Sequence, residues 1–240
     1  ACFRDASGNL LPPIVAGGPC TNLDKTTSDT DFIHRINATY KITDDALVYG
    51  TISRGFRPGG VNRRGTLPPY KPDFIDNYEL GFKTSWLNNR LRINGAVYQL
   101  DWTDIQLSFL GANGLTEIRS AGNARIRGAE FDLFARPATG LSISLGASYN
   151  DAEITEDYCL VANDLFDCTR PGPDGEANDL LAPAGTRLPI TSRFKGNALA
   201  RYEFPIAGWD AHVQAGAVYE GSRTADLRPL EDSIFGNLPS

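Results

Sequence analysis

The residues with the clearest capacity for binding chemistry gather between positions 54 and 70. Arginine guanidinium groups form paired hydrogen bonds with carboxylates and phosphates, and they also stack on aromatic rings. In this stretch they stand beside aromatic side chains, a combination that suits an anionic, partly aromatic ligand. The candidate ligand-binding residues are Arg54, Phe56, Arg57, Arg63, Arg64 and Tyr70.

Patterns of catalysis and metal binding do not occur in the sequence. His34 and His212 fall on opposite parities of alternating segments, and neither has a second ligand at metal-binding spacing. Glu130 and Asp132 lie two residues apart in another alternating segment, where electrostatic lining explains them better than acid–base chemistry. The acidic stretch 164–179 lacks the ligand spacing of a calcium loop. We therefore expect no enzyme activity, no metal site and no cofactor.

The charge balance and the apolar runs exclude further classes. The 240 residues carry 29 acidic and 23 basic side chains, and no basic run is longer than Arg63-Arg64. We expect no nucleic-acid partner, because non-specific binding to nucleic acid depends on clustered positive charge. No unbroken apolar run reaches about 20 residues, so no transmembrane helix is expected. A chain that begins at Ala1 and contains no methionine is expected to be a piece of a longer protein.

Side chains alternate in polarity with a period of two through most of the sequence. In 141–150, leucine, isoleucine, alanine and tyrosine occupy one parity, and serine, glycine and asparagine occupy the other. This period is that of a β-strand. The pattern predicts an all-β fold of eight strands, each near the 9–11 residues of a tilted membrane-spanning strand. The segments 46–56 and 91–106 alternate less regularly, which predicts bulges or a change of environment there.

The connections between the expected strands alternate between short and long. Antiparallel strands with all short turns at one end and all long loops at the other are typical of outer-membrane barrels. The apolar parity is small in mid-strand and aromatic near the strand ends, as expected where lipid fills gaps and aromatic girdles mark the interfaces. A soluble ligand-binding β-barrel is the alternative. The short turns are expected at 43–45, 87–90, 137–140 and 205–208, and the long segments at 1–30, 57–76, 107–122, 156–192 and 222–240.

Four motifs in this order resemble the barrel of TonB-dependent outer-membrane receptors. The first lies within the run from Leu47 to Gly60 and follows the pattern Tyr-x-x-x-Ser-x-Gly-Phe-x-Pro-Gly. The others run from Asn77 to Lys83, from Tyr98 to Gln106 and from Asn123 to Asp132. The resemblance implies an antiparallel up-and-down meander of about eight strands, taken from a larger barrel of the twenty-two-stranded type.

The same resemblance implies a function and a location. It implies an active-transport receptor in the outer membrane of a Gram-negative bacterium, which imports a scarce large solute. A ferric siderophore is favoured, and cobalamin or a saccharide is possible. Coupling to the TonB complex would pass through an N-terminal part absent from this sequence. The alternatives are a passive porin or small complete outer-membrane barrel, and the soluble β-barrel.

Membrane placement also implies how the chain is divided and which parity faces the lumen. Residues 1–240 are expected to form one partial barrel domain, with extracellular loops at 1–30 and 222–240 and eight transmembrane strands within 31–221. Arg or Lys at mid-bilayer on the lipid face costs about 2–4 kcal/mol, so the charged parity is expected to face away from lipid. The expected lumen-lining residues are Arg35, Lys41, Glu79, Lys83, Glu130, Asp132, Lys195, Arg201, Glu203, His212 and Glu220.

The stretch at 54–59 permits a second, structural interpretation. Gly55 would supply a bend, Phe56 would anchor the strand at the membrane interface, and Pro58 would end strand pairing. The arginines of this region are also suited to the phosphates of lipopolysaccharide, so outer-membrane lipid and lipopolysaccharide are expected partners beside a small-molecule ligand.

The four cysteines fall in two of the long segments expected on the extracellular side. Local disulfides are expected in that oxidising compartment, Cys2 with Cys20 and Cys159 with Cys168, each worth on the order of 3 kcal/mol in the chain-entropy model. Zinc binding is a poor alternative, because no histidine accompanies either pair.

Overall fold

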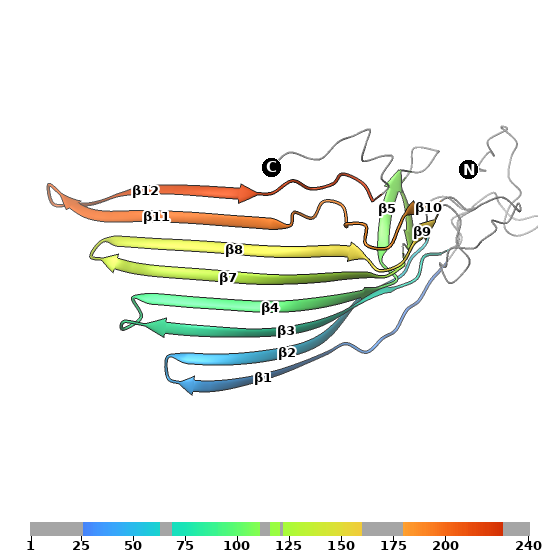
Figure 1. The fold of residues 1–240 in the computed structure, drawn as a ribbon, viewed down its shortest axis with the longest axis horizontal. Helices are drawn as coiled ribbons and strands as arrows, with labels where there is room; N and C mark the ends of the chain where they lie inside the picture. Colours follow the sequence, from blue (N-terminus) through green and yellow to red (C-terminus); the bar gives the residue numbers. More distant parts are fainter. Residues whose placement is uncertain (1–25, 63–68, 111–115, 121, 160–179, 228–240) are drawn as a thin grey trace, which may run out of the picture.

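The computed structural model describes residues 26–62, 69–110, 116–120, 122–159 and 180–227. Within these residues the chain forms strands and no helix, so none is long and apolar enough to cross a membrane. Eight strands form one antiparallel sheet in which sequence neighbours are spatial neighbours, in the order β1-β2-β3-β4-β7-β8-β11-β12 (Figure 1). This confirms the predicted eight-stranded meander. The strands are β1 (His34–Thr43), β2 (Ala46–Arg57), β3 (Asp73–Trp86), β4 (Leu91–Thr103), β7 (Ala124–Ala138), β8 (Leu141–Ile154), β11 (Phe194–Ile206) and β12 (Trp209–Glu220).

Four tight turns lie at one end of the sheet and the long connections at the other (Figure 1). We call these the turn end and the loop end. Ala207 and Gly208 join β11 to β12 with φ angles of 50° and 84°. Two consecutive positive φ values match the right-handed twist of the flanking strands, and glycine adopts them without a steric penalty. The expected sorting of short and long connections is therefore present in the structure.

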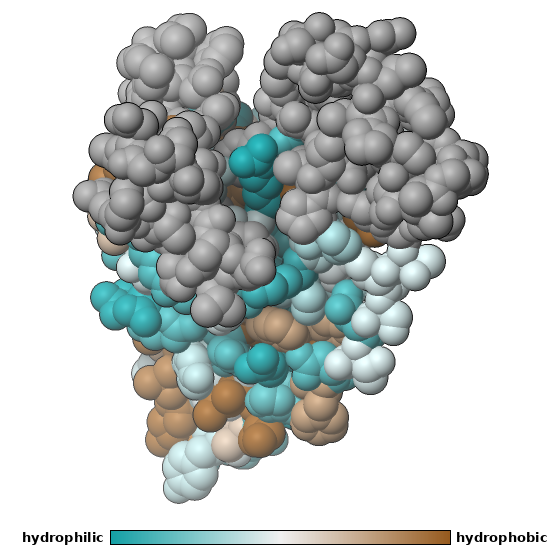
Figure 2. Space-filling view, turned by 90° about the vertical axis from the view of Figure 1, so that its right-hand side faces the viewer, coloured by the Kyte–Doolittle hydropathy of each residue, from teal (hydrophilic) through white to brown (hydrophobic). Residues whose placement is uncertain are grey.

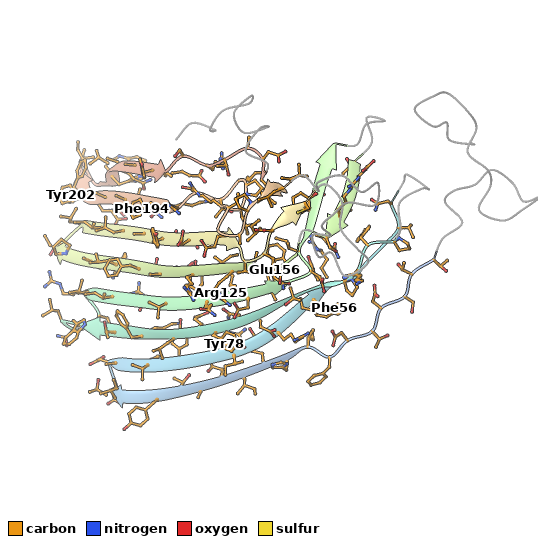
Figure 3. All side chains as sticks on the ribbon, turned by 45° about the vertical axis from the view of Figure 1, so that its right-hand side comes forward. Phe56, Tyr78, Arg125, Glu156, Phe194 and Tyr202 are labelled. Carbon is orange, nitrogen blue, oxygen red and sulfur yellow. The ribbon has the colours of Figure 1, made fainter. Side chains whose placement is uncertain are left out.

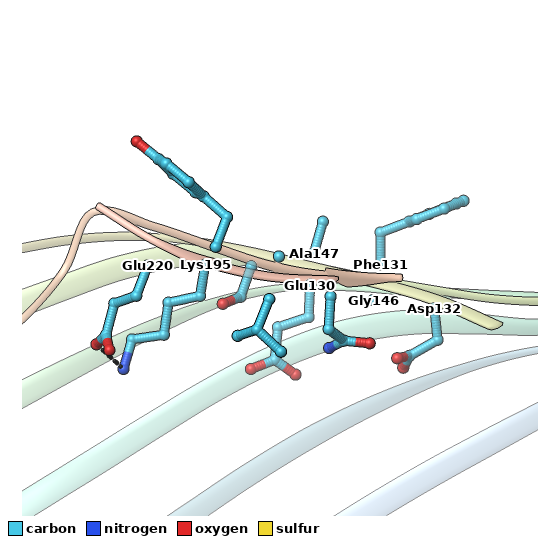
Figure 4. A pocket seen from close by; sticks show the side chains of 12 residues that line it. Glu130, Phe131, Asp132, Gly146, Ala147, Lys195 and Glu220 are labelled. Atoms are coloured by element: carbon cyan, nitrogen blue, oxygen red, sulfur yellow. Dashed lines mark ion pairs between the residues drawn. The ribbon is translucent and has the colours of Figure 1, made fainter. Parts of the chain in front are cut away.

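Strand register gives each face of the sheet a distinct composition. The sheet is curved, and Figure 4 shows Glu130, Asp132, Lys195 and Glu220 on its concave side, with Phe131 on the other. Pairing along β2, β3 and β4 is continuous, and register shifts in the large sheet occur near the turn end, at Lys41/Thr43 and Ala135/Ala138. Exposed large apolar side chains occupy the convex face: Ile36, Tyr40, Ile52, Tyr78, Leu80, Phe82, Trp86, Val97, Phe131, Leu145, Tyr149, Phe194, Tyr202, Val213 and Tyr219.

The two faces exchange polarity near the loop end. Along the convex parity of β4, apolar Val97 is followed by Gln99 and Asp101, whereas the concave parity ends in Leu100 and Trp102. This exchange is the predicted change of environment within 91–106. The pairing of β2 with β3 is continuous, and the one register shift along β2 lies at its start, where Lys41 and Thr43 of β1 face Leu47 and Ala46, so a bulge does not explain irregular alternation in the rest of 46–56.

Short strands at the loop end were not predicted. The expected strand 91–106 stops at Thr103, because Asp104 adopts a positive φ of 55°, and the chain turns into the hairpin of β5 (Gln106–Leu110) and β6 (Thr116–Ser120). A second small sheet pairs β9 (Tyr158–Cys159) with β10 (Leu180–Ala182). Strand β3 also begins four residues earlier than the expected long segment 57–76 allows, since Arg57 pairs with Asp73.

The buried apolar cluster of the described residues lies at the loop end, between these small sheets and the concave face. Its members are Ile105, Ala124, Ala152, Ile154, Ala182, Leu188 and Leu227, with Trp102 and Ile126 packed against them. Backbone hydrogen bonds from Leu188 to Ala152 and from Gly185 to Ile154 hold the later segment against β8, at 2.9 and 2.8 Å. Figure 2, viewed from the loop end, shows hydrophilic residues in the middle of this face and hydrophobic ones gathered toward its lower part.

The face assignment predicts opposite responses to arginine at two adjacent positions of β8. Ala147→Arg would place a charge on the convex face at mid-strand, which costs about 2–4 kcal/mol in lipid, so assembly into the outer membrane should fall sharply. Ser148→Arg lies on the concave face, between Glu130 and Lys195, and should assemble normally. Assembly of both variants is measured as the amount of protease-protected, heat-modifiable protein in isolated outer membranes. Equal assembly of the two variants would contradict the assignment.

Candidate lumen-facing and ligand-binding site

All eleven residues expected to line a lumen share the concave face of the sheet. The register pairs Glu130 with Ser148 and Ser148 with Lys195, and it carries the same face outward to Glu220 on β12. On the other side it links Arg35 and Lys41 of β1, through β2, to Glu79 and Lys83 of β3. A shared face is a finding of the structure, and the lining of an aqueous lumen by these residues stays a prediction.

Most charges on the concave face lie beside a partner of opposite charge or a phenol. Lys195 contacts Glu220 at 2.9 Å (Figure 4), and Arg201 contacts Glu203 at 2.8 Å. The hydroxyl of Tyr49 donates a hydrogen bond of 2.6 Å to Glu79. Arg35, Tyr49, Glu79 and Lys83, with their neighbours, line an open hollow of about 400 Å³. Between the turn end and the apolar cluster the concave face therefore carries paired charges, as an aqueous interior requires.

The structure separates the six residues predicted to bind ligand. Arg54 and Phe56 lie on the convex face, where the ring of Phe56 stacks on Phe74 and the guanidinium of Arg54 lies 4.7 Å from the centre of that ring. Arg57 has the opposite parity and lies near Trp102, 5.9 Å from the ring centre. Arg63 and Arg64 lie outside the described residues. Arg54 and Arg57 therefore point to different faces.

Arg57 is held in a buried polar network that we call the rim network. Its Nε and Nη2 groups both donate to the carboxylate of Asp73, and Nη2 also donates to the carbonyl of Gln106 at 3.1 Å. Asp73 is only 2% exposed. The side-chain amide of Gln106 donates to the carbonyls of Pro58 and Lys71, at 3.1 and 2.8 Å. The network thus joins both ends of the segment 58–72 to the start of β5.

A second contact fixes the middle of this segment. The side chain of Asn62 accepts a hydrogen bond from the backbone of Ile118 at 2.7 Å and donates one to its carbonyl at 2.8 Å. Gly60 and Tyr70 exchange backbone hydrogen bonds of 3.1 and 2.9 Å, and the phenol of Tyr70 lies against Gly60 where a Cβ atom has no room. The side chain of Tyr70 therefore packs within the segment 58–72, against Gly60, and the described part of that segment is a fixed surface.

Sequence reasoning missed Asn62, Asp73, Gln106 and Trp102. Their partners lie as far as 56 residues away along the chain, and polar residues in a long loop have no periodic signal. Asp73 is the first residue of β3, and it pairs directly with Arg57 at the end of β2.

Histidines and acidic groups provide no metal site in the described residues. His34 lies on the convex parity of β1, where its ring stacks on Phe32, and His212 lies on the concave parity of β12 opposite Glu203. No group of three or more histidine, cysteine or acidic side chains in the described part of the chain is placed to hold a metal ion. The acidic stretch 164–179 lies outside the described residues.

This fold and face composition define a segment of the wall of a transmembrane β-barrel that carries a folded rim at its loop end. The chain belongs to the family described as TonB dependent receptor-like, beta-barrel, whose sequence model matches residues 15–235. Members of this family are outer-membrane proteins of Gram-negative bacteria, and the chain is placed in that membrane accordingly.

Relatives and solved structures agree with the assignment. The chain is 29% identical over 158 residues to the pesticin receptor of Yersinia enterocolitica, a match that covers 64% of this chain and 23% of that protein. It is 28% identical over 118 residues to the ferric-pyoverdine 358 receptor of Pseudomonas putida, covering 48% of this chain and 14% of the receptor. The ferric yersiniabactin uptake receptor FyuA from Yersinia pestis has the same fold, with a TM-score of 0.60 at 21% identity over 80% of this chain and 26% of that one. The chain thus spans about a quarter of the length of the pesticin receptor.

The rim network predicts a local effect of losing one buried charge. Asp73→Asn keeps the size of the side chain but removes the acceptor charge for Arg57. A hydrogen bond to a charged group is worth on the order of 2 kcal/mol, so backbone amides of Gly60 and Gln106 should exchange with deuterium about 30-fold faster. Asp76→Asn is the control, because that carboxylate is 29% exposed in its pair with Arg54. Equal acceleration of amide exchange in both variants would show that the pair of Arg57 and Asp73 does not hold the segment 58–72 in place.

Cysteine pairing supplies another prediction. Cys159 is disulfide-bonded, whereas Cys2, Cys20 and Cys168 lie outside the described residues. We predict that its partner is Cys168, because the loop that this bond closes is the shortest available to it. Peptide mapping of the non-reduced protein by mass spectrometry should recover one linked peptide containing both cysteines. Recovery of Cys159 linked to Cys2 or Cys20 would contradict this pairing.

Proposed function

We propose that the chain forms part of the wall and the rim of an active outer-membrane receptor that imports a ferric siderophore with TonB energy coupling. The observation that carries the proposal is family membership over residues 15–235. Two of the similar proteins reported above are named for ferric chelates, pyoverdine and yersiniabactin. Coupling to TonB would use regions of those longer proteins that this chain does not span.

The concave face supports this function by its chemistry. A wide barrel lined with paired charges stays hydrated and accepts a polar solute, whereas an unobstructed lumen of that width would leak. A plug in the lumen, released by an energised partner when ligand is bound, would prevent this leakage. No catalytic role is proposed, since nothing in the face resembles a nucleophile with a general base.

The rim would supply the first contact for the ligand. The described ends of the segment 58–72 are held through Asn62, through Gly60 with Tyr70, and through Gln106, and Arg63 and Arg64 follow Asn62 in the sequence. We assign the proposed ligand contacts to this segment, because Arg54 and Phe56 lie on the convex face.

The convex face argues against the soluble alternative. Tyr78, Leu80 and Val97 are each about half exposed on neighbouring strands and form part of a continuous apolar band. An apolar surface of this extent on a soluble protein would aggregate or require a partner. A passive porin shares the band and the polar face, and it differs from an importer in needing no energy source.

The proposed function predicts both ligand dependence and energy dependence. Deleting residues 63–68 from the complete protein should reduce high-affinity uptake of its ferric siderophore about tenfold or more, because arginine contacts to an anionic ligand are lost. Uptake of radioactive iron chelate is measured in iron-starved cells, with barrel assembly as the control. Unchanged uptake would remove the segment from the site. Uptake that persists without TonB or the proton-motive force would favour the porin.

A further inference from the structure

Charged side chains form a belt on the convex face just beyond the apolar band, toward the loop end. One row of paired residues crosses five strands as Arg54, Asp76, Asp101, Arg125 and Glu153. The row next to it, closer to the turn end, contains Arg127 and Asp151, and Arg193 contacts Asp151 at 3.1 Å. We call these eight residues the charged belt. It contains four arginines and four carboxylates, so it is balanced in charge.

On β4, β7 and β8 the boundary between the belt and the apolar band is sharp, whereas on β2 and β3 the apolar Ile52 and Tyr78 occupy the row of Arg127 and the charges begin one row nearer the loop end. Arg127 lies two residues from Ala129 on the same face of β7, and Ala129 is in register with Val97 and Tyr149, which are 55% and 46% exposed. Two residues of a strand span about 7 Å. From Tyr78 to Trp86 the same face of β3 runs about 26 Å along a tilted strand, which is comparable with the apolar band of an outer-membrane barrel. The belt therefore lies at the level of lipid headgroups.

Most of the belt is satisfied within itself. Arg54 contacts Asp76 at 3.2 Å, and Arg125 contacts Asp101 at 2.7 Å through Nε. Arg127 donates from Nε to the side chain of Gln99 at 3.0 Å. Among the described residues, Arg125 and Arg127 bind their partners through Nε alone, so the two Nη groups of each guanidinium remain available. The side chain of Arg125, which is labelled in Figure 3, is 40% exposed. Arg127 is exposed as well.

From this geometry we propose that Arg125 and Arg127 bind a phosphate group of the outer-leaflet lipopolysaccharide. Two guanidinium groups two residues apart on one strand face can hold a single tetrahedral phosphate, which accepts paired hydrogen bonds from arginine. The long loops of outer-membrane barrels lie on the extracellular side, where this lipid forms the leaflet. Asp101 and Gln99 hold the two side chains by their Nε groups and so orient them toward the same headgroup. The lipid's acyl chains would cover Val97, Ala129 and Tyr149 below.

The carboxylates of the belt limit the strength of this site and set its character. Asp101 offsets much of the charge of Arg125, so long-range attraction is weak and binding depends on hydrogen bonds to the phosphate. A soluble anion lacks the acyl chains that bury apolar surface at the band, so it should bind far less well than the lipid. The proposal depends on membrane placement and not on the transported ligand.

The test measures lipid retained by the complete protein after purification in mild detergent. Native mass spectrometry with bisphosphorylated lipid A is expected to show at least tenfold less bound lipid for the double variant Arg125→Gln/Arg127→Gln than for wild type. Arg92→Gln, on the concave parity of β4, is the matched control and should bind as wild type does. Wild-type protein should likewise bind at least tenfold less lipid A when the lipid is dephosphorylated.

Two results would overturn the site. One is equal binding of phosphorylated lipid A by wild type and the double variant. The other is displacement of the bound lipid from wild type by millimolar inorganic phosphate, which would show a soluble-anion site. If the double variant fails to assemble, the exposed Arg127→Gln variant alone is measured against the same standard, and several-fold weaker binding is expected. Uptake of the iron chelate is recorded in parallel. If the double variant binds less lipid A but takes up iron at the wild-type rate, the lipid site is independent of the proposed transport function.

Discussion

Hydrocarbon solvates neither a charge nor an unpaired peptide group, and the arrangement of the sheet follows from this. Continuous antiparallel pairing satisfies the backbone groups inside the sheet, and a period of two keeps charges off the convex face. A one-residue slip of β3, β7 or β11 would move Lys83, Glu130 or Lys195, respectively, to the convex face, so the register of each strand is strongly determined. The shifts at Lys41/Thr43 and Ala135/Ala138 occur near turns, where water satisfies what pairing leaves open.

Beyond the apolar band the same constraint no longer holds, and the polarity of the two faces reverses. The concave parity at the loop end carries Trp102, Ala124 and Ile154, which are covered by the small sheets. The convex parity there carries Arg54, Asp101 and Arg125, a charged surface that hydrocarbon would not solvate. Because the segments over the concave face cannot rely on lipid, they build their own apolar cluster and a buried polar network around Asp73 and Gln106.

This reversal also explains how far the sequence could predict the structure. Alternation within 141–150 or 211–220 is a local signal, and it predicted strands, turns and the shared face of the charged residues correctly because the face of a side chain depends only on its own position in the strand. The break at Asp104, the β5–β6 hairpin and the β9–β10 pair had no such signal. They depend on contacts such as Asn62 with Ile118 and Leu188 with Ala152, whose partners are distant in sequence. Irregular alternation in 91–106 was the visible trace of the change in surroundings.

The motif Arg54 to Gly59 shows how a single stretch can serve two sides of the barrel wall. Because neighbouring residues of a strand point to opposite faces, Arg54 and Phe56 must meet the membrane boundary if Arg57 meets the interior. Phe56 and Phe74 then stack at the end of the apolar band, while Arg57 joins Asp73 under the rim. Arg57 is poorly placed to exchange its partner for a ligand although its side chain is 51% exposed, since the buried carboxylate of Asp73 would lose its cation. Arg54 and Arg57 therefore have structural partners in Asp76 and Asp73, and the proposed ligand contacts fall to the segment that follows them.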